Sequence, residues 1–193
     1  MQPRLILASA SPRRAHILQA LGVPFQVVVS HVDESLAPGE QAAAAAERLA
    51  RAKAESVAPG QPLPVLAADT LVVCEGQVLG KPGSPEQAAG MLRLLSGRAH
   101  DVVTGVCLVK DGAARSGVER TRVRFASLSD SEIAWYVASG EPLDKAGAYH
   151  VDGLGALFVA EVSGSPSNVE GLPVRLVLEL ARGAGVDLGP PSP

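Results

Sequence analysis

The chain has 193 residues, of which 47% are apolar and 19% are charged, a composition typical of a well-packed soluble domain and not of a disordered chain. Its net charge of −3 gives no support for a nucleic-acid surface, and no apolar run approaches the length of a membrane span. Because the first thirty residues also lack the apolar region of a signal peptide, we expect a cytoplasmic protein that binds neither nucleic acid nor a membrane.

Strand and helix signals alternate along the first half of the chain. Short apolar runs predict strands at 4–8, 25–29, 65–73 and 77–79. Helical spacing of apolar residues predicts helices at 11–21, at about 40–57 and between Ser84 and Gly97. The pair Glu75-Gly76 predicts a tight turn that joins the third and fourth strands in a hairpin. This alternation is typical of an α/β protein.

The second half of the chain continues the alternation. Apolar runs predict strands at 102–109, 119–126 and 156–162. Helix signals predict one helix from about Ser129 to Ala138 and a last helix that begins between Ser167 and Gly171. Arginines at positions 120, 122 and 124 alternate with less polar residues, so one face of that strand either is solvated or pairs with a second subunit in a homodimer.

The ends and the cysteines give two further expectations. We expect residues 1–183 to form a single domain and the Gly/Pro-rich residues 184–193 to form a frayed tail. Cys74 and Cys107 both fall within apolar runs, which predicts buried, reduced thiols.

Two arginines stand at an unfavourable place in the first helix. Ser11 and Pro12 predict the start of that helix, so Arg13 and Arg14 lie at its N-terminus. The helix dipole disfavours cations there by roughly a few tenths of a kcal/mol, and we expect an anion to compensate them. The chain has neither a GxGxxG pattern nor a P-loop, so the anion is bound in another way.

Asp69 interrupts the apolar run 65–73, which otherwise predicts a buried strand. An unpaired carboxylate is costly to bury, so this residue needs a partner. It either lies at the edge of the strand and hydrogen-bonds a nearby turn, or it holds a divalent cation or a catalytic water. The residues alone leave these alternatives open.

Three further charged residues have ordinary explanations when each is taken alone. Lys81 is typical of a surface lysine, Lys53 of a helix side chain that extends to solvent, and Glu34 of a loop acid. Together with Asp69 and the two arginines, they have the composition of a metal-assisted phosphate site. In such a site the cations bind a polyphosphate, and the carboxylates hold a divalent ion and activate water.

Eight sequence blocks resemble the Maf family of nucleoside triphosphate pyrophosphatases. They follow one another in the family's order over nearly the whole chain: LASASPRR (7–14), VDE (32–34), ARAKAE (50–55), AADTLVV (67–73), LGKP (79–82), HDVVTGV (100–106), SGEPLDKAGAY (139–149) and SNVEGLP (167–173). The resemblance implies an elongated, twisted mixed sheet flanked by helices, as in Maf and ITPase-like proteins, with an active-site cleft between two lobes. It also implies hydrolysis of a nucleoside triphosphate between its α and β phosphates, with Mg²⁺ or Mn²⁺ as the divalent cofactor.

The resemblance assigns roles to individual residues. It makes Asp69 the proton acceptor, and it implies the catalytic set Asp69, Lys81 and Glu34, with Glu34 and Asp69 as metal ligands. It assigns phosphate or metal handling to five residues: Ser9, Arg14, Glu34, Lys53 and Lys81. It assigns the selection of the base to three others: Arg13, Thr70 and Asp152.

The identity of the base depends on residues 144–152. The run DKAGAY at 144–149 resembles the branch of the family that hydrolyses dTTP and UTP, and modified pyrimidine nucleotides belong to the same expectation. That branch usually has glutamine where this chain has Asp152. An ionised aspartate only accepts hydrogen bonds, which suits the two donors of 7-methyl-GTP. Asp152 therefore makes a 7-methyl-GTP pyrophosphatase an alternative to a dTTP/UTP pyrophosphatase. The family resemblance implies a second alternative, a nucleotide-binding regulator of cell division and septum formation.

Overall fold

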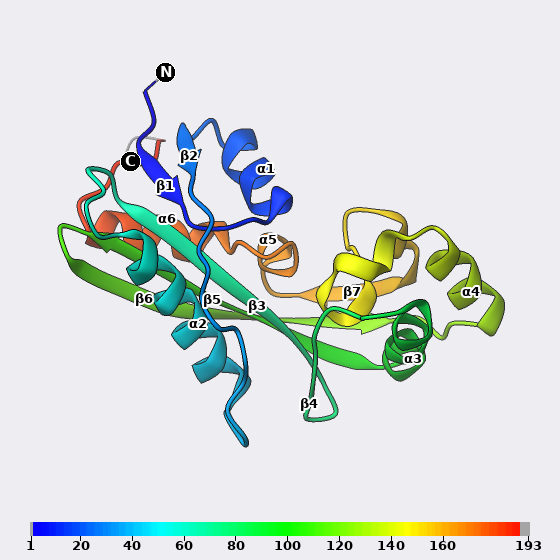
Figure 1. Ribbon diagram of the computed structural model, residues 1–193. Helices are drawn as coiled ribbons and strands as arrows, with labels where there is room; N and C mark the ends of the chain where they lie inside the picture. Colours follow the sequence, from blue (N-terminus) through cyan, green and yellow to red (C-terminus); the bar gives the residue numbers. More distant parts are fainter. Residues whose placement is uncertain (1, 190–193) are drawn as a thin grey trace. The chain divides into compact units, whose positions relative to one another are not determined.

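The computed structural model describes residues 2–189, which divide into two compact units (Figure 1). The first unit comprises the described residues of 1–69, 104–119 and 171–193, and the second comprises 70–103 and 120–170. Strands β3 (Val65–Cys74), β5 (Ala99–Lys110) and β6 (Ala113–Phe125) each contribute residues to both units.

The strands of the described residues form one seven-stranded mixed sheet, as expected from the α/β pattern. Its order is β2-β1-β3-β5-β6-β7, with β4 paired to β3, and the four short strands are β1 (Leu5–Leu7), β2 (Phe25–Val27), β4 (Gln77–Leu79) and β7 (Val159–Ser163). Strand β1 is parallel to both β2 and β3, whereas β4 is antiparallel to β3 and β7 is antiparallel to β6. Glu75 and Gly76 both have positive φ angles, 49° and 79°, as the predicted hairpin turn requires.

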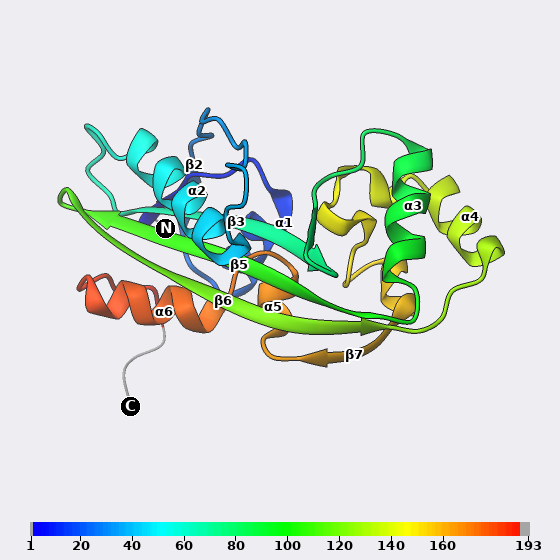
Figure 2. The ribbon, with the colours of Figure 1, turned by 90° about the horizontal axis from the view of Figure 1, so that it is seen from below.

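The helices divide between the two units. The first unit contains α1 (Pro12–Ala20), α2 (Ala42–Val57) and α6 (Val174–Gly183). The second contains α3 (Pro85–Leu95), α4 (Asp130–Ala138), α5 (Pro166–Val169) and the 3₁₀ helices η1 (Glu141–Asp144), η2 (Ala146–Ala148) and η3 (Leu154–Phe158). Figure 2 shows α2 and α6 on opposite faces of the strands of the first unit.

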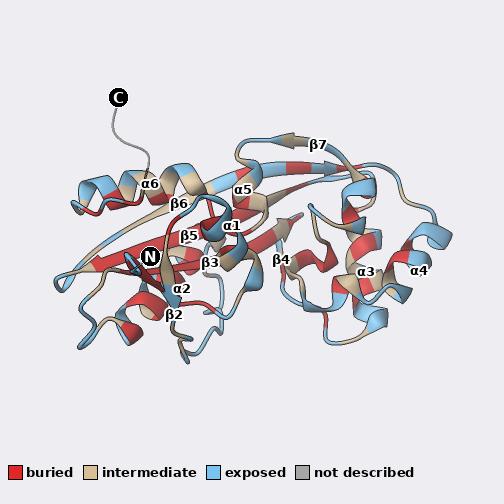
Figure 3. Ribbon diagram, turned by 90° about the horizontal axis from the view of Figure 1, so that it is seen from above, coloured by how far each residue is buried: buried red, intermediate tan, exposed pale blue. Residues whose placement is uncertain are grey.

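Alternating side chains of the first unit's strands build two cores, one on each face of the sheet. Leu5 and Leu7 of β1 belong to the core under α1 and α6, whereas Ile6 belongs to the core under α2. In β3 the same alternation places Val65 and Ala67 in the core under α2. Figure 3 shows the resulting buried stretches along the central strands.

Helix α2 lies unusually close to β5 because Gly105 has no side chain. A Cβ atom at this position would lie 2.2 Å from the carbonyl oxygen of Ala46 and 2.5 Å from the amide nitrogen of Glu47. Both are backbone atoms of α2, so no side chain fits here without moving the helix. Alanines on the buried side of α2, such as Ala50 and Ala54, permit the same close packing.

The second unit has a core of its own, to which α3, α4 and the strand residues contribute. Helix α3 packs against both α4 and η2. The largest fully buried side chains of this core include Tyr136 of α4 and Phe125 of β6. Ser129 caps α4 by a capping box with Glu132, which explains why the sequence predicted this start correctly.

The predicted strand 156–162 is wrong in its first part. Residues 154–158 form the 3₁₀ helix η3, and the strand begins only at Val159. Glu141 accepts hydrogen bonds from the amides of Leu154 and Gly155, which holds this stretch in a tight helical turn. That contact comes from a distant part of the chain, so the local pattern could not indicate it.

The predicted last helix is in fact two helices, α5 and α6, separated by residues 170–173. Gly171 has a φ angle of 100°, and Pro173 precedes the first residue of α6, so the chain cannot continue as one helix. The buried Asn168 of α5 donates hydrogen bonds to the carbonyl of Val102 and the hydroxyl of Thr121 in the second unit.

Residues 184–189 do not fray as expected. Val186 and Leu188 are buried in the core under α1 and α6, and the remaining tail, 190–193, lies outside the described residues. Cys74 and Cys107 are buried and free, as predicted. None of the described helices has the length and hydropathy required to cross a lipid bilayer.

Candidate functional site

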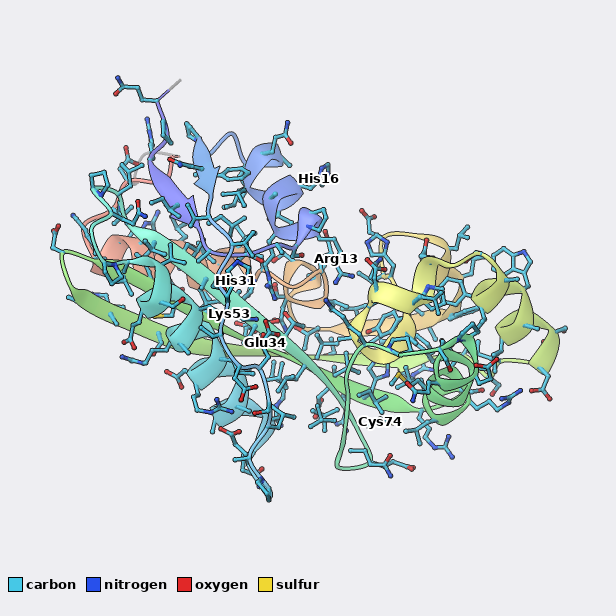
Figure 4. All side chains as sticks on the ribbon, in the orientation of Figure 1. Arg13, His16, His31, Glu34, Lys53 and Cys74 are labelled. Atoms are coloured by element: carbon cyan, nitrogen blue, oxygen red, sulfur yellow. The ribbon has the colours of Figure 1, made fainter. Side chains whose placement is uncertain are left out.

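A buried lysine connects two carboxylates in the first unit. The Nζ atom of Lys53 lies 2.6 Å from Oδ1 of Asp69 and 2.8 Å from Oε1 of Glu34. Lys53 and Asp69 are each only 6% exposed, whereas the side chain of Glu34 is 60% exposed. Figure 4 shows Lys53 and Glu34 beside each other. Of the alternatives for Asp69, a hydrogen bond to a nearby turn is replaced by an ion pair with a helix residue 16 positions earlier.

The periodicity of strand β3 and helix α2 explains why the side chains of Asp69 and Lys53 meet. Asp69 continues the series Val65 and Ala67 on β3, so its side chain lies on the face that α2 covers. Lys53 lies on the buried side of α2, one turn after Leu49. Its ammonium therefore meets Asp69 and does not extend to solvent, contrary to the ordinary explanation for a helix lysine.

Arg14 is the second buried cation of the first unit. Its Nε donates to the carbonyl oxygen of Gly171 at 2.8 Å, and its Nη1 donates to the hydroxyl of Ser9 at 3.1 Å. The amide of Ser11 donates to the same hydroxyl at 3.1 Å. Since Ser9 accepts in both bonds, neither of them uses the hydrogen of its hydroxyl group.

The charge of Arg14 is influenced by the carboxylate cluster. Burial lowers the pKa of the Arg14 guanidinium, the carboxylate of Asp69 raises it, the neighbouring Arg13 lowers it, and Glu34 raises it. Burial has the largest effect, so the net direction is downward. A further anion near Arg14 would raise the pKa of the guanidinium again and so stabilise its charge. This agrees with the expectation that an anion compensates the arginines of α1.

The loop that carries Glu34 is fastened to α2 by Arg48. This guanidinium makes two 2.7 Å hydrogen bonds to the carboxylate of Glu40 and a 3.1 Å bond to the carbonyl oxygen of Ser35. The bonds from Arg48, together with a hydrogen bond from the amide of Ala37, lower the pKa of Glu40 to about 2. Asp33 closes the other side of the same bend by accepting from the amide and hydroxyl of Ser35.

Glu34 and Asp69, the two carboxylates that meet at the Lys53 ammonium, are the residues that could hold a divalent cation. Among the described residues, no group of three His, Cys, Asp or Glu side chains gathers as a metal site. Two carboxylates nevertheless suit Mg²⁺, which keeps several waters and takes other ligands from substrate phosphates. The pair is therefore better suited to an ion that binds together with a polyphosphate than to a permanently enclosed ion.

Four predicted site residues remain besides the cluster of Lys53, Asp69 and Glu34 and the hydrogen-bonded pair of Arg14 and Ser9. Arg13 is half-buried on α1, one residue before Arg14. Thr70, Lys81 and Asp152 belong to the second unit: Thr70 is half-buried on β3, Lys81 is exposed after β4, and Asp152 is exposed in the turn before η3.

The sequence did not indicate two kinds of supporting residue. Arg48 and Glu40, which hold the Glu34 loop, lie eight residues apart around the start of α2, and no local pattern pairs them. Tyr136 and Glu141 are joined by a 2.7 Å hydrogen bond in the second unit, close to the turn that carries Asp152. Glu141 stands in the quoted block SGEPLDKAGAY, which was the only available signal.

Comparison with known proteins gives a consistent picture. A family model described as "Maf-like protein" matches residues 4–184. A protein named dTTP/UTP pyrophosphatase from Anaeromyxobacter sp. (strain Fw109-5) is 54% identical over 187 residues, which are 94% of this chain and 90% of that protein. A protein of the same name from Moorella thermoacetica (strain ATCC 39073 / JCM 9320) is 53% identical over 188 residues, with coverage of 96% and 97%.

A solved structure with a similar fold is that of the Staphylococcus aureus Ham1 protein. The TM-score is 0.54, and the match covers 93% of this chain and 98% of that chain. At 16% sequence identity the likeness concerns the fold alone, and it supports the mixed α/β sheet described above.

Proposed function

Since the chain belongs to the Maf family, we propose that it is a nucleoside triphosphate pyrophosphatase that hydrolyses dTTP and UTP to the nucleoside monophosphate and pyrophosphate. The relatives that carry this name share about half of their residues with the chain over nearly its whole length. Cytoplasmic location and a homodimer stay predictions from the sequence.

The cluster of Lys53, Asp69 and Glu34 is the observation that carries this proposal. A strand carboxylate that is 6% exposed is held by a lysine that is equally buried, and a second carboxylate reaches the same ammonium from a loop. Such a pair is expensive to bury and contributes little net stability, so a chemical role explains it better than a structural one.

In the proposed reaction a water molecule attacks the α-phosphorus, and Asp69 accepts its proton. Lys53 fixes the position of the Asp69 carboxylate through the 2.6 Å bond. Arg14 and the hydroxyl hydrogen of Ser9 bind the phosphates, and Lys81 stabilises the charge that develops on them. Glu34 and Asp69 would hold the divalent cation, which supplies charge neutralisation of the polyphosphate when bound.

The proposed base side consists of Arg13, Thr70 and Asp152. An ionised Asp152 accepts one hydrogen bond from the N3–H of thymine or uracil. The same carboxylate could accept hydrogen bonds from both donors of 7-methylguanine. Asp152 therefore makes 7-methyl-GTP the second candidate substrate.

The test is pyrophosphate release from dTTP, UTP, CTP, GTP, 7-methyl-GTP and 5-methyl-UTP, each with Mg²⁺ and with Mn²⁺, by the wild type and by Asp152→Gln. We expect the wild type to prefer dTTP and UTP. A preference for 7-methyl-GTP that Asp152→Gln moves toward pyrimidines would replace dTTP and UTP as the proposed substrates. Absence of pyrophosphate from every nucleotide would reject the pyrophosphatase itself.

A further inference from the structure

Glu141 is a half-buried carboxylate that accepts three hydrogen bonds within the second unit. Its Oε1 accepts from the hydroxyl of Tyr136 at 2.7 Å and from the amide of Gly155 at 3.1 Å. Its Oε2 accepts from the amide of Leu154 at 3.1 Å. The carboxylate therefore ties the buried face of α4 to the start of η3.

Tyr136 extends this network to the turn that contains Asp152. Tyr136 is fully buried, and its hydroxyl accepts a 3.0 Å hydrogen bond from the amide of His150. The amide of Gly153 donates to the carbonyl of His150 at 3.3 Å, which closes a four-residue turn with Asp152 at its third position. The first residue of this turn is thus anchored by Tyr136, and the two residues that follow the turn, Leu154 and Gly155, are anchored by Glu141.

The glycines of this segment fit closely around the same two side chains. A Cβ atom at position 153 would lie 2.4 Å from Oε2 of Glu141, and one at position 155 would lie 2.8 Å from the hydroxyl oxygen of Tyr136. A Cβ atom at position 155 would also lie 2.7 Å from the carbonyl oxygen of His150, a backbone atom. The chain therefore passes directly against the Glu141 carboxylate at position 153 and against the backbone of the turn at position 155.

The protonation states of the pair suit this arrangement. Burial raises the pKa of Glu141, but the hydrogen bonds from Tyr136, Leu154 and Gly155 outweigh it and hold the pKa below its usual value. Burial and the bond to Glu141 both raise the pKa of Tyr136. At neutral pH an ionised carboxylate accepts and a protonated phenol donates, so every bond of the network has a matching donor and acceptor.

We propose that Glu141, acting through Tyr136 and the amides of residues 154 and 155, is the positioning residue that fixes Asp152 for recognition of the substrate base. This inference rests on the proposed function, in which Asp152 contacts the base. Asp152 is exposed, and the anchoring of its turn supplies the order that an exposed side chain needs in order to discriminate between bases.

The direct test combines Glu141→Gln and Asp152→Asn in a double-mutant cycle. Glutamine keeps the size of the side chain but places an NH₂ group against a backbone N–H, so one anchor of the turn is lost. The measured quantity is the ratio of kcat/KM for dTTP to kcat/KM for CTP. Glu161→Gln, which removes an exposed surface partner of Arg124 in the same unit, is the matched control.

We expect Glu141→Gln to lower this ratio about tenfold, mainly through KM for dTTP, and to lower it no further when Asp152 is already asparagine. Hydrogen exchange of the amides of residues 150–155 should rise in Glu141→Gln and stay unchanged in Glu161→Gln. An unchanged ratio together with a lower melting temperature would overturn the proposal, because Glu141 would then be only structural.

Equal losses in the two backgrounds would also overturn it, because Glu141 would then act independently of Asp152. A wild type that releases pyrophosphate from no nucleotide would reject the proposed function and, with it, the role in base recognition. The exchange measurement separates the two failures, since faster exchange in Glu141→Gln would still support the anchoring of the turn.

Discussion

Lys53 and Asp69 are each only 6% exposed, and each is the reason that the other can be buried. A buried charge without a partner costs several kcal/mol, whereas a paired one contributes little net stability. The residue types were visible in the sequence because Asp69 interrupts an apolar strand. The identity of the partner was not, since helix periodicity alone makes Lys53 an ordinary flanking residue.

Asp69→Asn is expected to lower kcat by about 10²-fold to 10⁴-fold, because an amide cannot accept the proton of the attacking water. Binding of dTTP should persist, since Arg14, Ser9 and Lys81 remain. Steady-state kinetics together with calorimetric titration of the nucleotide checks both statements. The matched control is Asp33→Asn, whose carboxylate binds the backbone and hydroxyl of Ser35, and for which we expect nearly wild-type kcat.

His100 makes the stability of the chain depend on pH. Burial lowers the pKa of this histidine to about 4, and its Nε2 lies 2.9 Å from the hydroxyl of Tyr149. As the pH falls below about 6.5, the unfolded chain binds a proton that the folded chain does not, so the free energy of unfolding falls until about pH 4. At pH 5 the loss attributable to this residue is about 2 kcal/mol.

Urea denaturation at pH 7 and pH 5 tests this prediction. The free energy of unfolding should fall between pH 7 and pH 5 in both proteins, and the fall should be about 2 kcal/mol smaller in His100→Gln than in the wild type. His16→Gln, at an exposed position on α1, should leave the difference unchanged. An identical pH dependence in His100→Gln and the wild type would show that His100 is protonated equally in both states.

At the scale of elements, the closeness of α2 to β5 positions the Lys53 ammonium. Gly105→Ala places a methyl group 2.2 Å from the carbonyl oxygen of Ala46, so α2 must shift. We expect a loss of roughly 3 kcal/mol or more in the free energy of unfolding, and a lower kcat in whatever protein folds.

Gly90→Ala on α3 is the control for Gly105→Ala. No atom lies within 4 Å of the added Cβ, and alanine favours a helix over glycine, so stability should rise by about 1 kcal/mol. Thermal melting of both variants gives the comparison. Equal melting temperatures for Gly105→Ala and the wild type would mean that α2 does not approach β5 as described.

The loop between β2 and α2 depends on the Arg48 clamp. Arg48→Ala removes both bonds to Glu40 and the bond to the carbonyl of Ser35, so the Glu34 loop gains freedom. We expect a rise of several-fold in the Mg²⁺ concentration needed for half-maximal activity, with little change in the melting temperature. Arg51→Ala, on the same helix, loses the contacts to Glu55 of α2 and Ser116 of β6 and should leave the metal requirement unchanged.

Most helices and strands could be predicted because their signals are local. The capping box at Ser129, the positive-φ turn at Glu75-Gly76 and the apolar spacing of α3 all lie within a few residues of the element they define. The errors occurred where distant contacts decide the local structure. Glu141 binds the amides of residues 154 and 155 at the start of the unexpected 3₁₀ helix, and Val186 and Leu188 pack into a core that no tail composition could indicate.

At the scale of the whole molecule, the net charge does not favour the binding of a polyphosphate. The chain carries a net charge of −3, so in the proposed function the attraction of a polyphosphate depends on Arg14 and Lys81 and not on the overall charge. Strands β3, β5 and β6 each supply residues to both compact units. We propose on this ground that the two units fold as one domain, as the sequence led us to expect, and that the packing of Val186 and Leu188 extends this domain past the predicted boundary at residue 183.

In the proposed reaction, water attacks the α-phosphorus of a nucleoside triphosphate with Asp69 as the proton acceptor. The most direct measurement is hydrolysis of dTTP in ¹⁸O-labelled water, followed by mass spectrometry of both products. We expect the label to enter thymidine monophosphate and pyrophosphate to be unlabelled, with the rate lowered by about 10²-fold to 10⁴-fold in Asp69→Asn. Label in pyrophosphate, or release of inorganic phosphate with thymidine diphosphate, would contradict it.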